Sequence, residues 1–207
     1  MSNPDESIDS LDELMPEFGN RSITNKWVFE ECQAIVKTHL PYYSFFRMHP
    51  SVLIVRDPRD IAISSAKFYE GLTSSTEKMS IHDVVRDPAI GFEAFLKHYR
   101  GWQPHARRIV KYEDIKSQPN QELGEIARLF GIIRSEAEID EAVQASSFDS
   151  MRKAQSSSPK LTGKFRDGHQ FVRTGQTRQW DTLLSEDDLI LYATLCRKYD
   201  FSLYESS

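Results

Sequence analysis

Residues 52–64 read VLIVRDPRDIAIS and contain a strand, a turn and the start of a helix. Val52 to Val55 form a short apolar run without alternation, which is typical of a strand buried on both faces of a parallel sheet. Asp57 suits the N-cap of the helix that follows, and Pro58 suits its first position. The stretch therefore predicts a strand–turn–helix unit, the building block of an α/β fold.

Similar signals continue in both directions along the chain. Apolar runs at 34–36 and 108–112 predict two more buried strands. Apolar residues at helical spacing predict four helices: one over 92–103, one from Pro119 to a glycine cap at Gly131, one over 135–145, and one after a cap at Ser185. Residues 154–175 are rich in Ser, Lys, Arg and Gly and predict a long mobile loop. We expect one domain over 26–207, preceded by a loosely ordered, acidic lead-in over 1–25.

Composition excludes several classes of protein. The 207 residues carry a formal net charge of −5, which argues against a general nucleic-acid binder or an anionic-membrane binder. No apolar run approaches the length of a membrane-spanning helix, and the acidic N-terminal stretch lacks the apolar core of a signal peptide. Cys32 and Cys196 form no CxxC motif and no disulfide framework. These features predict a cytoplasmic protein.

Basic and hydroxyl side chains follow the predicted strands. Lys37 and His39 follow the first, Arg56 the second, and Tyr112 ends the third. Ligands of open parallel sheets bind beyond the carboxyl ends of the strands. Ser64 lies roughly 10 Å along the helix from Asp57 at 1.5 Å per residue, so its hydroxyl and an extended Arg56 could meet around one anion. The pattern predicts an anion site.

Plainer interpretations of these residues stay open. Arg56 could form a local ion pair with Asp57, Lys37 and His39 could belong to a solvated loop, and Tyr112 could be a packing residue at a strand end. The histidines show no metal-ligand spacing, and we expect no metal. Neither a Walker A motif nor a GxSxG elbow is present, which argues against a phosphoryl kinase and an α/β-hydrolase.

Five segments in this order resemble the cytosolic-type sulfotransferases that use 3′-phosphoadenosine 5′-phosphosulfate (PAPS). Lys37 to Pro41 match the family's KTHLP segment, and residues 53–64 resemble its 3′-phosphate segment. Residues 111–115 resemble its YEDL strand end, residues 146–151 its TSFxxM segment, and residues 171–180 its closing RKGxxGxW motif. The resemblance covers roughly residues 30–205 and implies a P-loop-NTPase-like fold, in which helices flank a parallel sheet in three layers.

The resemblance also implies roles for the matched residues. His39 would be the general base that accepts a proton from a small alcohol, phenol or amine, and Lys37 would offset negative charge on the transferring group. The cofactor-binding positions would be Arg56, Ser64, Tyr112, Ser146, Phe148, Met151, Arg173, Thr174 and Gly175. Arg56, Ser64, Arg173 and the Gly175 backbone would hold the 3′-phosphate, and Tyr112, Ser146, Phe148 and Met151 would border the adenine. The loop at 154–175 would cover the cofactor.

Departures from the family pattern suggest alternatives. The family carries a phosphate loop of the form YPKSGTTW upstream of KTHLP, and no such stretch occurs here, so the first strand and that loop are expected to be missing. Thr174 replaces a lysine and Arg178 a glycine of the closing motif. The family's KxxxTVxxxE motif is also absent after Trp180, so dimerisation by that route is not supported. The chain is expected to be either a truncated sulfotransferase or an inactive 3′-phosphoadenosine-binding remnant or gene fragment.

Overall fold

The computed structural model describes residues 17–18, 35–72, 79–156, 165–166, 169 and 175–204. In chain order the described elements are β1 (Glu17–Phe18), β2 (Lys37–Thr38), the 3₁₀ helix η1 (Ser44–Met48), β3 (Val52–Val55), α2 (Pro58–Gly71), α3 (Ile81–Arg86), α4 (Phe92–Trp102), β4 (Arg108–Lys111), α5 (Tyr112–Ser117), α6 (Pro119–Leu129), α7 (Glu136–Ala145), α8 (Phe148–Ser156), α10 (Trp180–Leu183) and α11 (Glu186–Tyr199).

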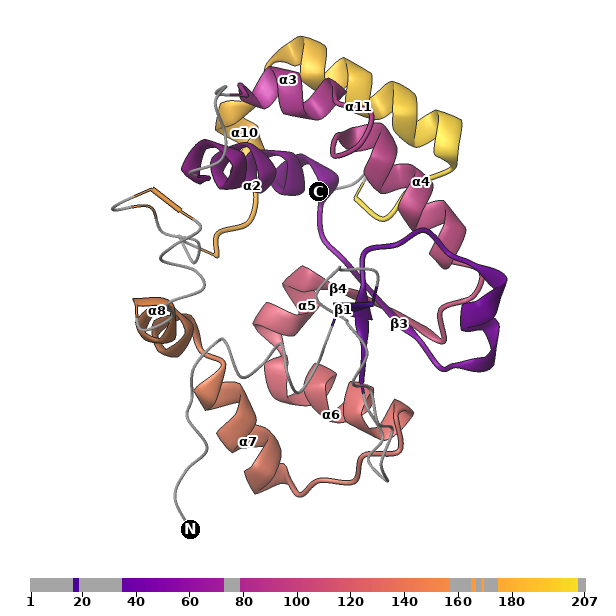
Figure 1. Cartoon of the computed structure of the whole chain (residues 1–207), viewed down its shortest axis with the longest axis vertical. Helices are drawn as coiled ribbons and strands as arrows, with labels where there is room; N and C mark the ends of the chain where they lie inside the picture. Colours follow the sequence, from indigo (N-terminus) through magenta and orange to yellow (C-terminus); the bar gives the residue numbers. More distant parts are fainter. Residues whose placement is uncertain are drawn as a thin grey trace.

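The described strands pair in parallel. β3 and β4 align in register, with Val52 opposite Arg108 and Val55 opposite Lys111, while β1 pairs with β2. The strands lie at the centre of Figure 1, with α2, α3, α4, α10 and α11 above them, α5 beside them, and α6 and α7 below. Parallel strands joined by helices on both sides confirm the predicted α/β fold.

Two predicted boundaries were wrong. The strand expected at 34–36 lies instead at Lys37–Thr38, and Val36 is 37% exposed. The position of a strand depends on the partner strand with which it forms hydrogen bonds, and the apolar pattern alone does not identify that partner. The third strand ends at Lys111, because Tyr112 opens α5 with two acidic residues in its first turn, where the helix dipole favours them.

The predicted helix ends are confirmed where caps carried the signal. The Asp57 carboxylate accepts a hydrogen bond from the Arg59 amide, and Ser185 forms a capping box with Asp188. Gly131 adopts φ +74°, as its place after α6 predicted. Helix α8 extends to Ser156 and so includes the first three residues of the predicted 154–175 loop; most of the remainder of that loop lies outside the described residues.

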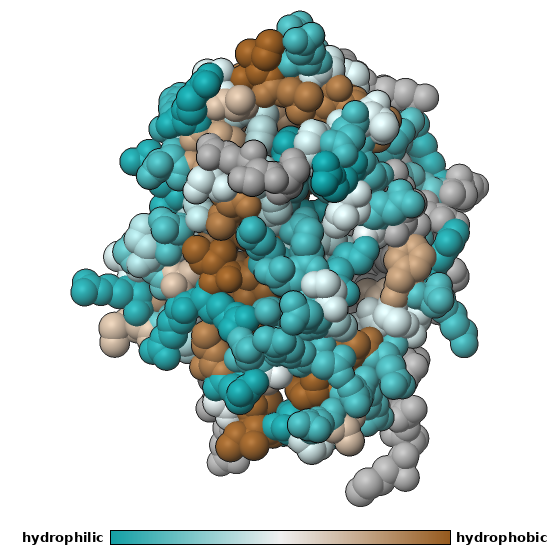
Figure 2. All heavy atoms as spheres, turned by 180° about the vertical axis from the view of Figure 1, so that it is seen from behind, coloured by the Kyte–Doolittle hydropathy of each residue, from teal (hydrophilic) through white to brown (hydrophobic). Residues whose placement is uncertain are grey.

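The hydrophobic core joins β3 to the upper group of helices. Its most deeply buried large side chains are Val55, Ile63, Val84, Val85, Phe92, Leu96, Val110 and Phe201. The face in Figure 2 is largely hydrophilic and carries its apolar side chains in several separate groups. Among the described helices, none has the length and apolar character needed to cross a membrane.

Arg59 cross-links the start of α2 to the C-terminal part of the chain. Its guanidinium binds Asp57 through Nε and Nη2, at 2.9 and 2.6 Å, and donates to the Tyr204 carbonyl at 3.1 Å. The Arg59 Cζ atom lies 3.6 Å from the centroid of the Trp180 ring and 4.8 Å from that of Tyr192. This buried cluster fixes the turn that carries Arg56.

Candidate functional site

Arg56 and Tyr112 meet where β3 and β4 end. Val55 and Lys111 are register partners, so the next residue of each strand emerges at the same edge of the sheet. The Arg56 Cζ atom lies 4.8 Å from the centroid of the Tyr112 ring, a cation–π geometry. The register of the pair therefore brings together two residues that the sequence placed 56 positions apart.

Arg56 retains an unused donor. Its Nη2 donates to the Gln176 carbonyl at 2.8 Å and lies 4.0 Å from Asp60 Oδ2. Its Nε is buried and has no hydrogen-bond partner among the described residues. The alternative of a local pair with Asp57 is not what forms, because Asp57 binds Arg59. A buried donor without an acceptor costs about 1–3 kcal/mol, so this atom favours an added acceptor.

Gly175 joins the site next to Gln176, whose carbonyl accepts from Arg56. It has φ +57°, in the left-handed region that favours glycine. A Cβ built there would lie 3.6 Å from Phe148 Cδ2, 3.7 Å from Tyr112 Oη and 3.8 Å from Lys116 Nζ. Lys116 Nζ donates to the Gly175 carbonyl oxygen. Four predicted residues, Arg56, Tyr112, Phe148 and Gly175, thus lie in one cluster.

The other predicted cofactor residues are less closely tied to that cluster. Ser64 is exposed on α2, and Met151 is half-buried on α8. The Ser146 hydroxyl donates to the Ala142 carbonyl at 2.7 Å and so takes part in ending α7. Arg173 and Thr174 lie outside the described residues.

Lys37 lies in β2, and His39 follows that strand beside α4. The Leu40 amide donates to Thr38 Oγ1 at 3.1 Å, and Trp102 Nε1 donates to the Leu40 carbonyl at 2.9 Å. His39 is exposed, whereas its neighbour His98 is partly buried. Burial lowers the pKa of His98, and the charge of His39 lowers it further. The two imidazoles therefore interact electrostatically.

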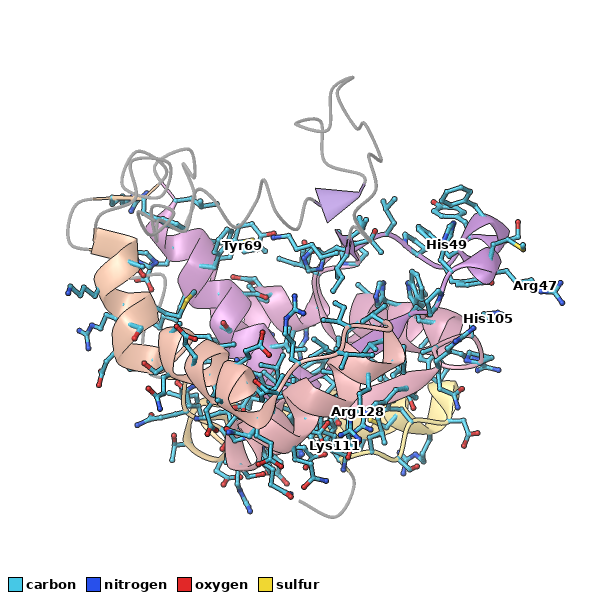
Figure 3. The ribbon with its side chains drawn as sticks, turned by 90° about the horizontal axis from the view of Figure 1, so that it is seen from below. Arg47, His49, Tyr69, His105, Lys111 and Arg128 are labelled. Atoms are coloured by element: carbon cyan, nitrogen blue, oxygen red, sulfur yellow. The ribbon has the colours of Figure 1, made fainter. Side chains whose placement is uncertain are left out.

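Aromatic side chains gather next to this segment. The Tyr42 ring stacks on His105 with centroids 3.8 Å apart, and Phe46 lies 5.0 Å from Trp102. Tyr43 and Phe45 are exposed. Figure 3 shows Arg47, His49 and His105 on the same side of the molecule. The segment that follows His39 therefore exposes aromatic side chains.

Sequence reasoning missed three groups at the site: Asp60, Lys116 and the Gln176 carbonyl. Lys116 follows Tyr112 by four residues, so both share one helix face once α5 begins at Tyr112. The predicted strand at 108–112 concealed this relation. Asp60 and the Gln176 carbonyl were missed because the hydrogen bonds that tie them to the site join residues 118 to 120 positions apart. The described residues contain no cluster of three or more His, Cys, Asp or Glu able to hold a metal ion.

A family model described as "Sulfotransferase domain" matches residues 23–198. The chain belongs to the sulfotransferase family. Among curated relatives, mouse sulfotransferase 2A6 is 24% identical over 73% of this chain and 58% of its own length, and human sulfotransferase 2A1 is 23% identical over 72% and 58%. The chain therefore spans less than two thirds of the length of these sulfotransferases.

Solved structures show the same fold. A retinol dehydratase in complex with androsterone and the inactive cofactor PAP superposes with a TM-score of 0.67, at 21% identity over 84% of this chain and 55% of that one. Mouse sulfotransferase SULT7A1 complexed with PAP gives a TM-score of 0.65, at 18% identity over 80% and 64%. The predicted P-loop-NTPase-like α/β fold of the sulfotransferases is confirmed.

Proposed function

We propose that this chain carries the nucleotide-binding and acceptor-activating residues of a sulfotransferase. The reaction moves a sulfuryl group from PAPS to the hydroxyl or amine of a small acceptor: an alcohol, a phenol or an amine. The cluster of Arg56, Tyr112, Phe148 and Gly175 is the observation that carries this proposal. Each of these residues also stands in a segment that resembles a nucleotide-binding motif of the family, and solved neighbours hold PAP.

The chemistry of the cluster fits a phosphorylated adenosine. Arg56 offers a permanent charge and an unused buried donor, Nε, which suit a phosphate oxygen. The rings of Tyr112 and Phe148 suit a flat base, since purines stack on aromatic side chains. In this proposal Arg56, Ser64, Arg173 and the Gly175 backbone hold the 3′-phosphate, while Tyr112, Ser146, Phe148 and Met151 border the adenine. When bound, the nucleotide supplies the sulfuryl group for transfer.

His39 is the proposed general base. Its imidazole accepts the proton of the acceptor hydroxyl or amine, the role that histidine takes most often in general acid–base catalysis. Lys37, two residues earlier, offsets negative charge near the reacting atoms. The exposed aromatic side chains of Tyr43 and Phe45 supply apolar surface near His39 for the body of the acceptor.

The test separates proton transfer from binding. His39→Ala removes the base but leaves the Arg56 cluster intact, so it should abolish transfer of sulfuryl from PAPS to a panel of alcohols, phenols and amines. Its affinity for adenosine 3′,5′-bisphosphate should stay within about threefold of the wild type. His49→Ala, at the exposed residue that follows η1, is the matched control. Retained transfer in His39→Ala would overturn the assignment.

A second candidate function is nucleotide binding without transfer. It is favoured by the cluster of Arg56, Tyr112, Phe148 and Gly175, whose residues hold a nucleotide in this proposal and take no part in proton transfer. Bisphosphate binding combined with no transfer to any acceptor would support this candidate over the first.

A further inference from the structure

Asp60 is a buried carboxylate next to the candidate site. It lies in the first turn of α2 with 1% of its surface exposed. A carboxylate withdrawn from water is costly unless hydrogen bonds and opposite charges replace its hydration. The partners of Asp60 therefore show what the fold gains from it.

Those partners are two consecutive backbone amides from the far end of the chain. The Arg178 amide donates to Oδ2 at 2.7 Å, and the Gln179 amide donates to Oδ1 at 2.9 Å. Both carboxylate oxygens thus accept hydrogen bonds from the backbone that follows Gly175 and Gln176. The carboxylate holds this backbone against α2, directly beside Arg56.

The backbone that Asp60 grips is strained. Arg178 has φ +63°, a left-handed conformation that a non-glycine residue adopts at a cost of about 1–2 kcal/mol. Such conformations persist only where the surroundings determine them. Its side chain pairs with the exposed carboxylate of Asp181 at 3.2 Å, and its Cζ lies 5.8 Å from the centroid of the Trp180 ring. Its backbone amide is held by Asp60.

Asp60 also acts on Arg56. Its Oδ2 lies 4.0 Å from Arg56 Nη2, the atom that donates to the Gln176 carbonyl. One carboxylate therefore attracts the guanidinium and anchors the segment whose carbonyl that guanidinium binds. Burial raises the pKa of Asp60, and the nearby charge of Asp57 adds to this, whereas the Arg178 and Gln179 amides and the charge of Arg56 lower it. The charged form of Asp60 thus depends on the partners that it holds.

We propose that Asp60 is a positioning residue for the nucleotide: it fixes residues 176–179 relative to Arg56 so that the guanidinium faces the 3′-phosphate. This inference rests on the proposed function. Asp60 does not touch the nucleotide in this account, and its effect passes through Arg56.

The test compares the affinities for adenosine 3′,5′-bisphosphate and adenosine 5′-monophosphate by calorimetry. Asp60→Asn keeps the size of the side chain, but its amide nitrogen cannot accept from the second backbone amide. The affinity for the bisphosphate should fall about tenfold, the loss expected for one charge-assisted hydrogen bond, with little change for the monophosphate. Asp181→Asn, which removes a charge on the same segment without touching Asp60, should leave both affinities unchanged.

A double-mutant cycle separates positioning from a general loss of structure. In an Arg56→Lys background, Asp60→Asn should no longer lower the bisphosphate affinity selectively, because the planar guanidinium that Asp60 positions is absent. Equal losses for both nucleotides in both backgrounds would overturn the inference. If Asp60→Asn fails to fold, Asp60→Glu takes its place, because it retains the charge but moves the carboxylate. The same selective loss of bisphosphate affinity is expected in that variant. Wild-type discrimination between the two nucleotides in Asp60→Glu would overturn the inference.

The outcomes distinguish this inference from the proposed function. If the wild-type chain discriminates between the two nucleotides and Asp60→Asn does so equally well, only the inference fails. If the wild-type chain does not discriminate, the proposed function fails, and the role of Asp60 fails with it.

Discussion

The guanidinium of Arg56 lies over the ring of Tyr112, with Cζ 4.8 Å from the ring centroid, because β3 and β4 end at the same level of the sheet. The contact joins a permanent cation to an aromatic face at the edge where parallel sheets bind ligands. Gly175 and Phe148 complete the cluster from the second half of the chain.

Replacement of Arg56 by Lys should weaken binding of the 3′-phosphate selectively. Lysine keeps a positive charge opposite Asp60 but loses the planar set of donors that matches a phosphate. We expect the affinity for adenosine 3′,5′-bisphosphate to fall at least about tenfold, with unfolding temperature nearly unchanged. Arg100→Lys, at an exposed position of α4, is the control. Unchanged affinity in calorimetric titrations would argue against Arg56 as a phosphate ligand.

Replacement of Arg178 by Gly should stabilise the fold. Glycine adopts φ +63° without the steric cost that arginine bears, but it loses more conformational entropy on folding. The net result should be a rise of roughly 0.5–1 kcal/mol in the free energy of unfolding. Urea unfolding measures this gain. Arg178→Ala, which also loses the exposed pair with Asp181 but keeps a Cβ, should show no gain; equal effects of the two variants would contradict the explanation.

Replacement of Arg59 by Leu should destabilise the protein strongly. The change leaves Asp57 buried without its cation and removes the contact with Trp180. Breaking a buried pair from one side costs about 3–5 kcal/mol. Chemical unfolding should show that loss, and Asp57→Asn added to Arg59→Leu should recover part of it. A loss under about 1 kcal/mol would contradict the role given to this cluster.

Protonation of His98 should destabilise the fold at mildly acidic pH. Burial, together with the charge of His39, lowers the pKa of His98 in the folded state below the value near 6.5 of an unfolded chain. As pH falls through 6.5, the unfolded state takes up the proton first, so the free energy of unfolding decreases. His98→Gln should reduce the difference in stability between pH 7.5 and 5.5, whereas the exposed His49→Gln should not.

The local parts of the fold were predictable from the sequence. The β3–α2 unit carries an unambiguous apolar run, an N-cap at Asp57 and a proline at the first helical position, and each signal depends only on neighbours. Strand β2 was misplaced because its position depends on Glu17 and Phe18, its pairing partners. Pairing across the sheet is a tertiary choice that apolar periodicity does not encode.

The grouping of the candidate site residues was predictable from their positions at strand ends and from their match to family segments. Arg56, Tyr112, Phe148 and Gly175 were expected to act together, and they do lie together. Lys116 and Asp60 were not expected, since one depends on where α5 begins and the other binds backbone amides of residues 178 and 179. A carboxylate that acts on main-chain donors leaves no trace in the side-chain pattern of its partners.

The most direct test of this account is a calorimetric titration of the purified chain with adenosine 3′,5′-bisphosphate and with adenosine 5′-monophosphate. Circular dichroism on the same sample verifies that the chain is folded. A 3′-phosphate held by Arg56 should make the bisphosphate bind at least about tenfold more tightly, the effect of one charge-assisted contact. Equal affinities, or no binding by a folded chain, would contradict the assignment of the Arg56 cluster as a nucleotide site.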